Sequence, residues 1–385
     1  MKTAILNGII LTPDQTLRDH ILLLEDGRIT AILNKDGYPL SSEFSIIDAQ
    51  ECFVIPGLID IHVHGGNGAD TMDGSPEALT TMAVFFAQHG VTAFLPTTVT
   101  ASKADILQAI ENVSHFSSIP NGAQPLGIHL EGPYLHRDYR GAQPPQHLRP
   151  ADPAEYRLWL RNPQVRLITV APEVEGVMDL IRAGRECGIE FAVGHSQASF
   201  EQVIQAVEIG LRQVTHTFNG MPPLHHRMPG VVGAALSDHR LFTQIIPDGI
   251  HVHPAVIKIL VASKGIDRTI AITDAIRAAG LADGEYRLGD QTIQVVEGIA
   301  RTKTGSLAGS TLTYDQALRN MIQFANLSLS EALPMFTRVP AQALGLEQQK
   351  GSLKPGADAD LVFLDTSDRV RLTMVAGQIV YQNMH

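Results

Sequence analysis

Between residues 58 and 274 the chain alternates short apolar runs with stretches that have the spacing of amphipathic helices. Each run has the length and composition of a buried strand. The runs cover residues 58–64, 91–96, 126–131, 165–171, 190–195, 213–216, 242–247 and 269–274. Eight strands separated by helices predict an α/β fold, a (β/α)8 TIM-like barrel, because parallel strands need helical crossovers. An open doubly wound sheet is the competing fold. It is weakened because no Gly-x-Gly-x-x-Gly motif follows an early strand.

Start signals support several of the predicted helices. Ser75 precedes Pro76, and Ser199 is followed three residues later by Gln202, as in a capping box. We expect helices at residues 76–88, 103–116, 200–209 and 254–263. Two more, at residues 314–325 and 330–344, would close the barrel after its eighth strand.

Both ends of the chain have a different pattern, of short strands joined by polar turns. Asn7-Gly8 and Asp26-Gly27 each predict a tight hairpin between apolar residues. Strands are also expected at residues 360–364, 370–375 and 378–381. Neither end is large enough to bury a core alone. We therefore predict one small β-sandwich domain from residues 1–55 and 347–385, with the barrel at residues 56–346.

The composition argues against several classes of protein but does not indicate an activity. The chain has 385 residues, a formal charge of -11 and two cysteines, Cys52 and Cys187. The negative charge argues against nucleic acid or an anionic membrane as a partner. Two unrelated cysteines exclude a disulfide framework. Because no signal peptide or long apolar run is evident, we expect a cytoplasmic protein.

Polar residues of chemically useful types end several of the predicted strands. In a (β/α)8 barrel the catalytic groups lie at the carboxyl ends of the strands. Those positions hold His62, His64, Glu131, His195, His216 and Asp274. Each alone could be structural, as a buried histidine bonded to the backbone or as a helix cap. Four histidines and a glutamate meeting on one barrel face instead predict a divalent cation.

The nature of these ligands limits the metal and suggests the chemistry. Nitrogen and oxygen ligands suit zinc first, with iron, manganese and cobalt as alternatives. His62 and His64 are two residues apart on a strand and therefore face the same side. Asp274 would be ionised at neutral pH and could accept a proton from a metal-activated water.

Longer motifs resemble those of N-acetylglucosamine-6-phosphate deacetylases of the amidohydrolase superfamily. The His-Leu-Glu-Gly-Pro run at residues 129–133 and the Asp-Gly-x-His-Val-His-Pro run at residues 248–254 are specific to that family. Further matching segments are residues 56–65, 95–98, 194–196, 216–221, 224–227, 272–275 and 307–310. The resemblance implies hydrolysis of N-acetyl-D-glucosamine 6-phosphate to D-glucosamine 6-phosphate and acetate. The alternatives are the N-acetylgalactosamine 6-phosphate epimer, another metal-dependent amidase of the superfamily, and a non-catalytic barrel.

The resemblance also assigns roles to individual residues. It implies that Glu131, His195 and His216 hold the principal metal and that Asp274 is the acid/base. His251 would polarise the acetamide carbonyl. Some relatives lack the His-x-His pair and bind one metal. This chain has His62 and His64, so one or two metals per subunit are expected, with Glu131 bridging them.

Substrate contacts are assigned in the same way. Arg227 would meet the sugar phosphate by reaching across from a second subunit of a homodimer or homotetramer. The sugar site would be lined by Ala142, Gln143, Asn219, Gly220, Asp248, His251, Ser306, Leu307 and Ala308. The family often has a histidine where this chain has Gln143, and this departure leaves the sugar contacts at that position open.

Overall fold

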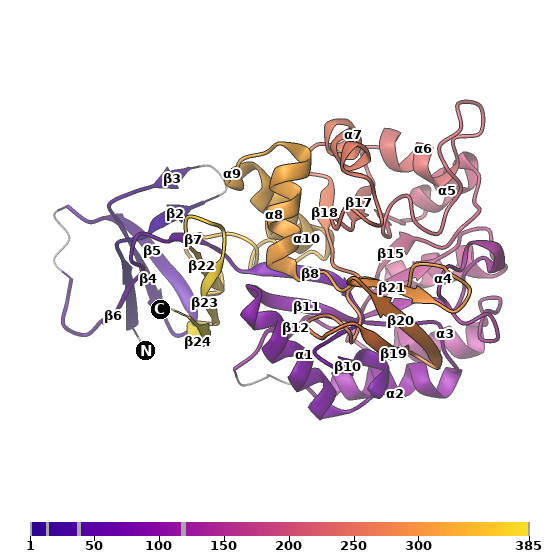
Figure 1. Cartoon of the computed structure of the whole chain (residues 1–385), viewed down its shortest axis with the longest axis horizontal. Coiled ribbons are helices and arrows are strands. Elements are labelled where there is room, and N and C mark those ends of the chain that lie inside the picture. The colour runs from indigo at the N-terminus through magenta and orange to yellow at the C-terminus, as the bar shows by residue number, and fades with distance from the viewer. Residues whose placement is uncertain (1, 13–14, 37–39, 117–120, 384–385) are drawn as a thin grey trace.

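A parallel barrel forms the centre of the computed structural model, which describes residues 2–12, 15–36, 40–116 and 121–383. Its strands pair in chain order, each parallel to the next, which confirms the predicted (β/α)8 fold (Figure 1). The strands are β8 (Leu58–Val63), β11 (Val91–Thr98), β13 (Ile128–Glu131), β14 (Val165–Val170), β15 (Glu190–Val193), β16 (Gln213–Val214), β17 (Phe242–Ile245) and β18 (Thr269–Ala271). Just beyond β18, the Asp274 amide donates to the His62 carbonyl and so links the last strand to the first.

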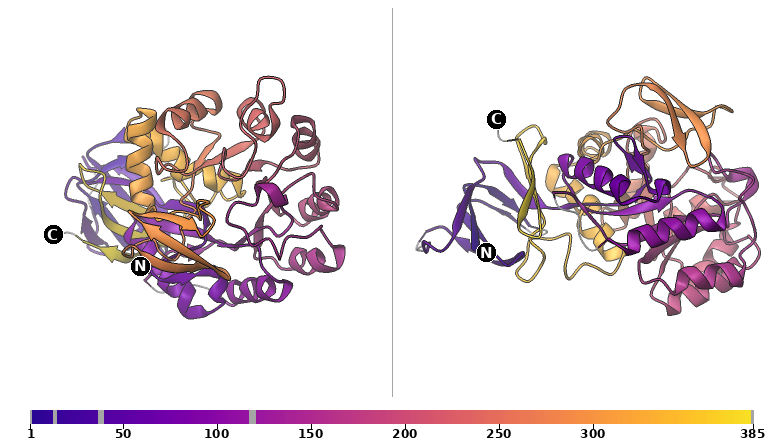
Figure 2. Two further views of the ribbon diagram at one scale, coloured as in Figure 1. Left: turned by 45° about the vertical axis from the view of Figure 1, so that its right-hand side comes forward. Right: turned by 90° about the horizontal axis from the view of Figure 1, so that it is seen from below.

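Helices surround this barrel and follow the strands along the chain (Figure 2). They are α1 (Pro76–Gln88), α2 (Lys103–Ser114), α3 (Pro153–Leu160), α4 (Val177–Glu186), α5 (Phe200–Glu208), α6 (Gly230–Ser237), α7 (Pro254–Lys264) and α8 (Tyr314–Ala325). Ser75 and Ser199 cap α1 and α5 as predicted, the second in a capping box with Gln202. No helix in the described ranges is both long and apolar enough to cross a bilayer.

The single helix predicted at residues 330–344 is instead three short pieces. They are α9 (Leu329–Ala332), η3 (Leu333–Phe336) and α10 (Arg338–Ala343). The chain bends at Thr337, whose φ of -132° and ψ of -84° are not helical. Pro334 and Pro340 lack the N–H groups that a continuous helix would use.

Strands from both chain ends form two further sheets, side by side at one end of the molecule (Figure 1). One contains, in order, β5 (Arg28–Asn34), β4 (His20–Glu25), β1 (Lys2–Leu6) and β6 (Ser45–Asp48). The other contains β24 (Gln378–Gln382), β23 (Val370–Val375), β22 (Leu361–Leu364), β7 (Phe53–Pro56), β2 (Ile9–Leu11) and β3 (Thr16–Leu17). Leu22, Leu24, Phe363 and Leu372 share one buried cluster, which confirms a sandwich built from both ends. The residue boundaries of the two domains stay a prediction.

One of the two predicted N-terminal hairpins is wrong. Asp26-Gly27 does join an antiparallel pair, in which Glu25 lies opposite Arg28. Asn7-Gly8, however, carries the chain from β1 in one sheet to β2 in the other. A Cβ on Gly8 would lie 2.5 Å from Val54 Cγ2, so the backbone passes close to β7 at this corner. The turn residues are those of a hairpin, but packing against Val54 decides where the chain goes.

A three-stranded antiparallel sheet, which the sequence analysis missed, lies between β18 and α8 in the chain. It contains β19 (Gly284–Leu288), β20 (Gln291–Val296) and β21 (Ile299–Thr302). The two-residue turn Gly289-Asp290, with Gly289 at φ 55°, is a hairpin signal that could have revealed it. In the right-hand view of Figure 2 this sheet lies on the barrel, away from the sandwich. Leu288, Ile293 and Val295 pack there against Val99 and Ile276.

Candidate metal centre and active site

The five predicted metal ligands converge at the carboxyl ends of the barrel strands. They form two groups, His62 with His64 and Glu131, and Glu131 with His195 and His216; in each, the ligand atoms lie within 4.8 Å of one another. Glu131 therefore belongs to both. Its Oε1 lies 3.2 Å from His195 Nε2 and 3.1 Å from His216 Nε2. Its Oε2 lies 3.3 Å from His64 Nε2.

The backbone turns sharply where three of the polar residues leave their strands. His195, His216 and Asp274 have φ of 49°, 28° and 52°, in or near the left-handed region, which non-glycine residues seldom adopt. Backbone hydrogen bonds hold Asp274 there, because its amide donates to His62 and its carbonyl accepts from Ser310. Such strain persists only where the surroundings impose it, and it is common at functional sites.

Hydrogen bonds on the far side of two imidazoles determine which nitrogen faces the site. His64 Nδ1 lies 3.1 Å from the Thr97 carbonyl, and His195 Nδ1 lies 2.9 Å from the Tyr139 carbonyl. A carbonyl can only accept, so both Nδ1 atoms carry hydrogen. In the neutral rings, each Nε2 then directs a lone pair toward the Glu131 carboxylate. This arrangement is favourable only with positive charge between these atoms.

A metal cation supplies that charge better than protons can. The pKa of His195 is raised, because the hydrogen bond and charge of Glu131 outweigh the effect of burial. Burial lowers the pKa of the adjacent His216, and the charge of His195 lowers it further. Neighbouring imidazoles therefore oppose one another's protonation, whereas one cation can be shared by several nitrogens. Nitrogen and carboxylate ligands without thiolate fit zinc or a similar divalent ion.

Asp274 lies beside His62 in β8 and beside His64, which directly follows that strand. Its Oδ1 is 3.1 Å from His64 Nε2 and 3.4 Å from His62 Nε2. Burial raises the pKa of Asp274, but the charge of His62 and the hydrogen bond and charge of His64 outweigh it and lower the pKa to about 2. The carboxylate is therefore ionised at neutral pH and can accept a proton.

A cavity of about 260 Å³ opens onto these groups. Of the predicted sugar-site residues, it is lined by Ala142, Gln143, Asn219, Gly220, His251, Ser306 and Leu307. Sequence reasoning missed Val99, Gly141, Leu288 and Gly309, which also line it. Ala308 is fully buried, and its amide donates to Ala300. The cavity is thus bounded by the barrel loops on one side and by the additional three-stranded sheet on the other.

Comparison with known proteins identifies the family of this chain. The model of the amidohydrolase family matches residues 53–380. The chain belongs to the amidohydrolase family. It is a hydrolytic enzyme that acts on an amide.

This amidohydrolase is similar along nearly its whole length to proteins of known activity. It is 40% identical to an N-acetylglucosamine-6-phosphate deacetylase from Vibrio furnissii, over 97% of this chain and 93% of that one. It is 39% identical to an N-acetylgalactosamine-6-phosphate deacetylase from Escherichia coli O157:H7, over 96% and 97% of the two chains. A variant of the N-acetyl-D-glucosamine-6-phosphate deacetylase of Mycobacterium smegmatis, solved in complex with N-acetyl-D-glucosamine-6-phosphate, shares 33% identity and a TM-score of 0.91, with 99% and 100% coverage.

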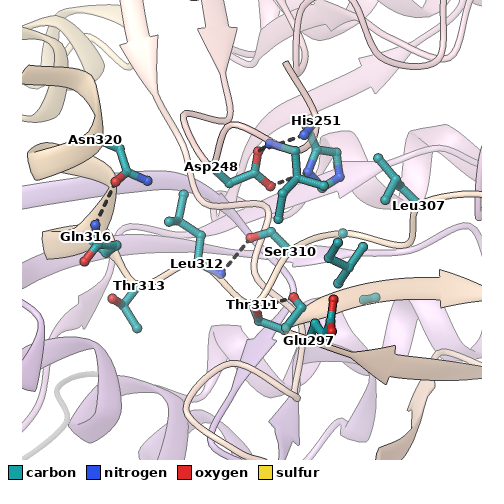
Figure 3. Close-up of a pocket in the computed structure, with 15 residues that line it drawn as sticks. Asp248, His251, Glu297, Leu307, Ser310, Thr311, Leu312, Thr313, Gln316 and Asn320 are labelled. Carbon is teal, nitrogen blue, oxygen red and sulfur yellow. Dashed lines mark hydrogen bonds and ion pairs between the residues drawn. The ribbon is translucent and has the colours of Figure 1, made fainter. Parts of the chain in front are cut away.

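Asp248 in this amidohydrolase contacts His251 and lies outside the metal-facing cavity. Its Oδ1 accepts from the amides of Ile250 and His251, and its Oδ2 lies 2.6 Å from His251 Nδ1. Burial lowers the pKa of His251, but the hydrogen bond and charge of Asp248 outweigh it and raise the pKa. Asp248 itself lines a second hollow of about 340 Å³, and His251 and Leu307 border both (Figure 3). Asp248 therefore orients the imidazole that reaches the active site.

Arg227 lies outside the lining of the cavity, on an exposed loop. Its Nη1 is 2.8 Å from Nε2 of the adjacent His226. The same loop exposes large apolar side chains, because Leu224 is 56% and Met228 is 72% exposed. Arg227 is therefore not among the residues of this chain that line the cavity, although the resemblance assigns it a substrate contact.

Two buried polar residues within barrel strands, Gln244 of β17 and Asp60 of β8, were not among the predicted site residues. Gln244 Oε1 lies 3.4 Å from His62 Nδ1, and Gln244 in turn donates to Gln213. Asp60 accepts from the Thr273 hydroxyl and from the His62 amide. Burial raises the pKa of Asp60 to about 7. Polar residues inside apolar strands were the available signal, because buried polar groups require partners.

Proposed function

We propose that this amidohydrolase removes the acetyl group of N-acetyl-D-glucosamine 6-phosphate, which yields D-glucosamine 6-phosphate and acetate. The observation that carries the proposal is the Asp274 carboxylate 3.1 Å from His64, at a cavity lined by most of the residues that the resemblance assigns to the sugar site. A general base, ligands for at least one metal ion and a cavity for the substrate are the parts that metal-assisted amide hydrolysis uses.

We propose that one or two divalent cations, zinc first, complete the site. Glu131, His195 and His216 would hold one, and His62, His64 and Glu131 the other. When bound, such a cation lowers the pKa of a water and polarises a carbonyl oxygen. Its charge also satisfies the lone pairs that His64 and His195 direct toward Glu131.

The remaining chemistry is assigned to the side chains of this chain. Asp274 accepts a proton as the water oxygen bonds to the acetamide carbon. His251, oriented by Asp248, donates a hydrogen bond to the carbonyl oxygen as negative charge develops there. Asp274 then delivers its proton to the amine nitrogen as the carbon–nitrogen bond breaks. Acetate and the free amine are the products, and Asp274 is again ionised.

We propose that Arg227 binds the substrate phosphate in the site of a second copy of this chain, within a homodimer or homotetramer. The exposure of Arg227 and of the neighbouring Leu224 and Met228 supports this, because exposed apolar side chains often mark an interface. Arginine is also well suited to bind phosphate through two parallel hydrogen bonds.

The galactosamine epimer is the second candidate substrate, because relatives named for the two sugars are 40% and 39% identical to this chain. The decisive experiment measures acetate release from both N-acetylhexosamine 6-phosphates and from N-acetylglucosamine without phosphate. We expect the highest kcat/KM for N-acetyl-D-glucosamine 6-phosphate and a much lower value without phosphate. A higher kcat/KM for the galactosamine compound would assign the other substrate. No acetate from any of them would contradict the deacetylase proposal.

A further inference from the structure

Gln143 contacts a metal ligand as well as lining the cavity. Its side chain is buried, with the residue 6% exposed. Gln143 Nε2 lies 2.6 Å from Glu131 Oε2, and Gln143 Oε1 lies 2.7 Å from the Thr100 amide nitrogen. A backbone N–H can only donate, so Thr100 fixes the side-chain amide with its oxygen toward Thr100 and its NH2 group toward Glu131.

The carboxylate that Gln143 holds is the one shared by the two groups of metal ligands. Glu131 Oε1 faces His195 and His216, whereas Oε2 faces His64 and Gln143. Rotation of this carboxylate would remove an oxygen from both groups. A hydrogen bond to one oxygen opposes that rotation and still leaves a lone pair on the same oxygen for a cation.

Gln143 is itself held in place by the surrounding loops. Its amide donates to the Arg140 carbonyl, and the adjacent Ala142 carbonyl accepts from Gln291 of β20. The same loop meets the β19–β20 turn at Asp290, which lies 2.7 Å from Gln146 Nε2 and 3.3 Å from His147 Nε2. The backbone around Gln143 is therefore held directly by the Arg140 and Gln291 contacts, and the Asp290 contacts hold a later part of the loop.

We infer that Gln143 is a positioning residue for the Glu131 carboxylate and that it sets the affinity of the metal centre. This deepens the proposed function, from which it takes the identity of the metal ligands. A neutral amide is suited to the role because it accepts from Thr100 and donates to Glu131 at once. A carboxylate in its place would direct a second negative charge at Glu131. Hydrogen-bond partners of metal ligands typically contribute about 10- to 100-fold in metal affinity.

The test is a titration of metal-free protein with Co²⁺, followed by its visible absorption, without any substrate. Gln143→Leu removes both hydrogen bonds, and Gln143→Glu keeps the shape but cannot donate when ionised. We expect either change to weaken the more weakly held Co²⁺ about 10- to 100-fold. Gln143→His, which can accept and donate at once, should restore much of that affinity. If the protein holds a single cation, the same loss is expected for it, because Glu131 belongs to both groups.

Gln146→Leu is the matched control, because Gln146 lies on the same loop but contacts Asp290 instead of a metal ligand. It should bind Co²⁺ as the wild type does. Circular dichroism of the metal-free proteins checks folding, and Gln143→Glu carries the test if Gln143→Leu does not fold. Wild-type Co²⁺ affinity in Gln143→Glu, with a raised KM, would overturn the inference and make Gln143 a sugar-binding residue. Because the titration contains no sugar, it decides this point even if the enzyme prefers another substrate.

Discussion

Oδ1 of Asp274 lies 3.1 Å from Nε2 of His64, so the proposed proton acceptor and a proposed metal ligand face the same space. The two residues come from opposite ends of the barrel sequence, just beyond β18 and just beyond β8. The hydrogen bond from the Asp274 amide to the His62 carbonyl joins these ends. Closure of the barrel is therefore what assembles the reacting groups, and this geometry leads to specific predictions.

Asp274→Asn should abolish most of the activity and leave the metal in place. Asparagine keeps the shape but cannot accept a proton, and proton transfer typically contributes about 100- to 10,000-fold to the rate. Steady-state kinetics and metal analysis of the same preparation check this. A variant within about tenfold of wild type would assign the proton transfer to another group, with His251 the next candidate. Loss of metal together with activity would instead make Asp274 chiefly a ligand.

Metal removal should abolish activity, and the metal count should reveal the role of the β8 histidines. Prolonged chelation is expected to give inactive protein that a divalent cation reactivates. If both groups are filled, the wild type holds nearly two metals per chain, and a variant with both His62→Asn and His64→Asn holds about one. Elemental analysis gives both counts. One metal in each protein would make the histidine pair structural, and full activity in metal-free protein would contradict the mechanism.

Arg227→Ala and Asp274→Asn should each be nearly inactive alone but recover activity when mixed. If Arg227 serves the site of its partner, a mixed dimer contains one site with both an intact Asp274 and an intact Arg227. Random reassociation of a two-fold dimer then restores about a quarter of the wild-type activity. The measurement is acetate release after equal amounts are unfolded and refolded together. Each variant refolded alone is the control, and no recovery beyond these controls would argue against a shared site.

Asp315→Asn should destabilise the barrel at neutral pH, because Asp315 joins α8 to the C-terminal end of α1. Its carboxylate lies 2.9 Å from His89 after α1 and 2.9 Å from Arg319 in α8. Burial raises the pKa of Asp315, but the hydrogen bond and charge of His89 and the charge of Arg319 outweigh it and hold the pKa below its ordinary value of 3.8. We expect a loss of about 1–3 kcal/mol in the free energy of unfolding.

The stabilisation by Asp315 should be lost at low pH, because the pKa of its carboxyl group is lowered in the folded protein. A carboxylate whose pKa is lower in the folded protein stabilises the fold fully at a pH above its pKa in the unfolded chain. This contribution is lost as the pH falls through its pKa in the folded protein. The difference in the free energy of unfolding between wild type and Asp315→Asn should thus have its full size at pH 5 and become smaller below about pH 4. Urea unfolding across this range measures it. Asp267→Asn, which removes only an exposed partner of Arg338, is the matched control and should cost at most about 1 kcal/mol. A pH-independent difference would show that the charge of Asp315 does not matter.

The barrel and most of the candidate site could be predicted from local patterns in the sequence. A buried parallel strand is apolar along its length, and a polar residue at its carboxyl end stands out against that background. Because every strand of a (β/α)8 barrel ends on the same face, His62, Glu131, His216 and Asp274 could be grouped without any coordinates. The resemblance to deacetylase motifs added His251 and the loops that line the cavity.

What the sequence by itself determined was therefore the order of elements and the residue types at the strand ends. The tertiary structure alone decided which groups touch. It brings Asp274 to His64 and Gln143 to Glu131, and it leaves Arg227 on an exposed loop. It also sends Asn7-Gly8 between two sheets, because Val54 packs against that corner. The physical reason is that periodicity and turn chemistry act over a few residues, whereas these contacts join residues far apart in the chain and depend on packing and on buried polar groups finding partners.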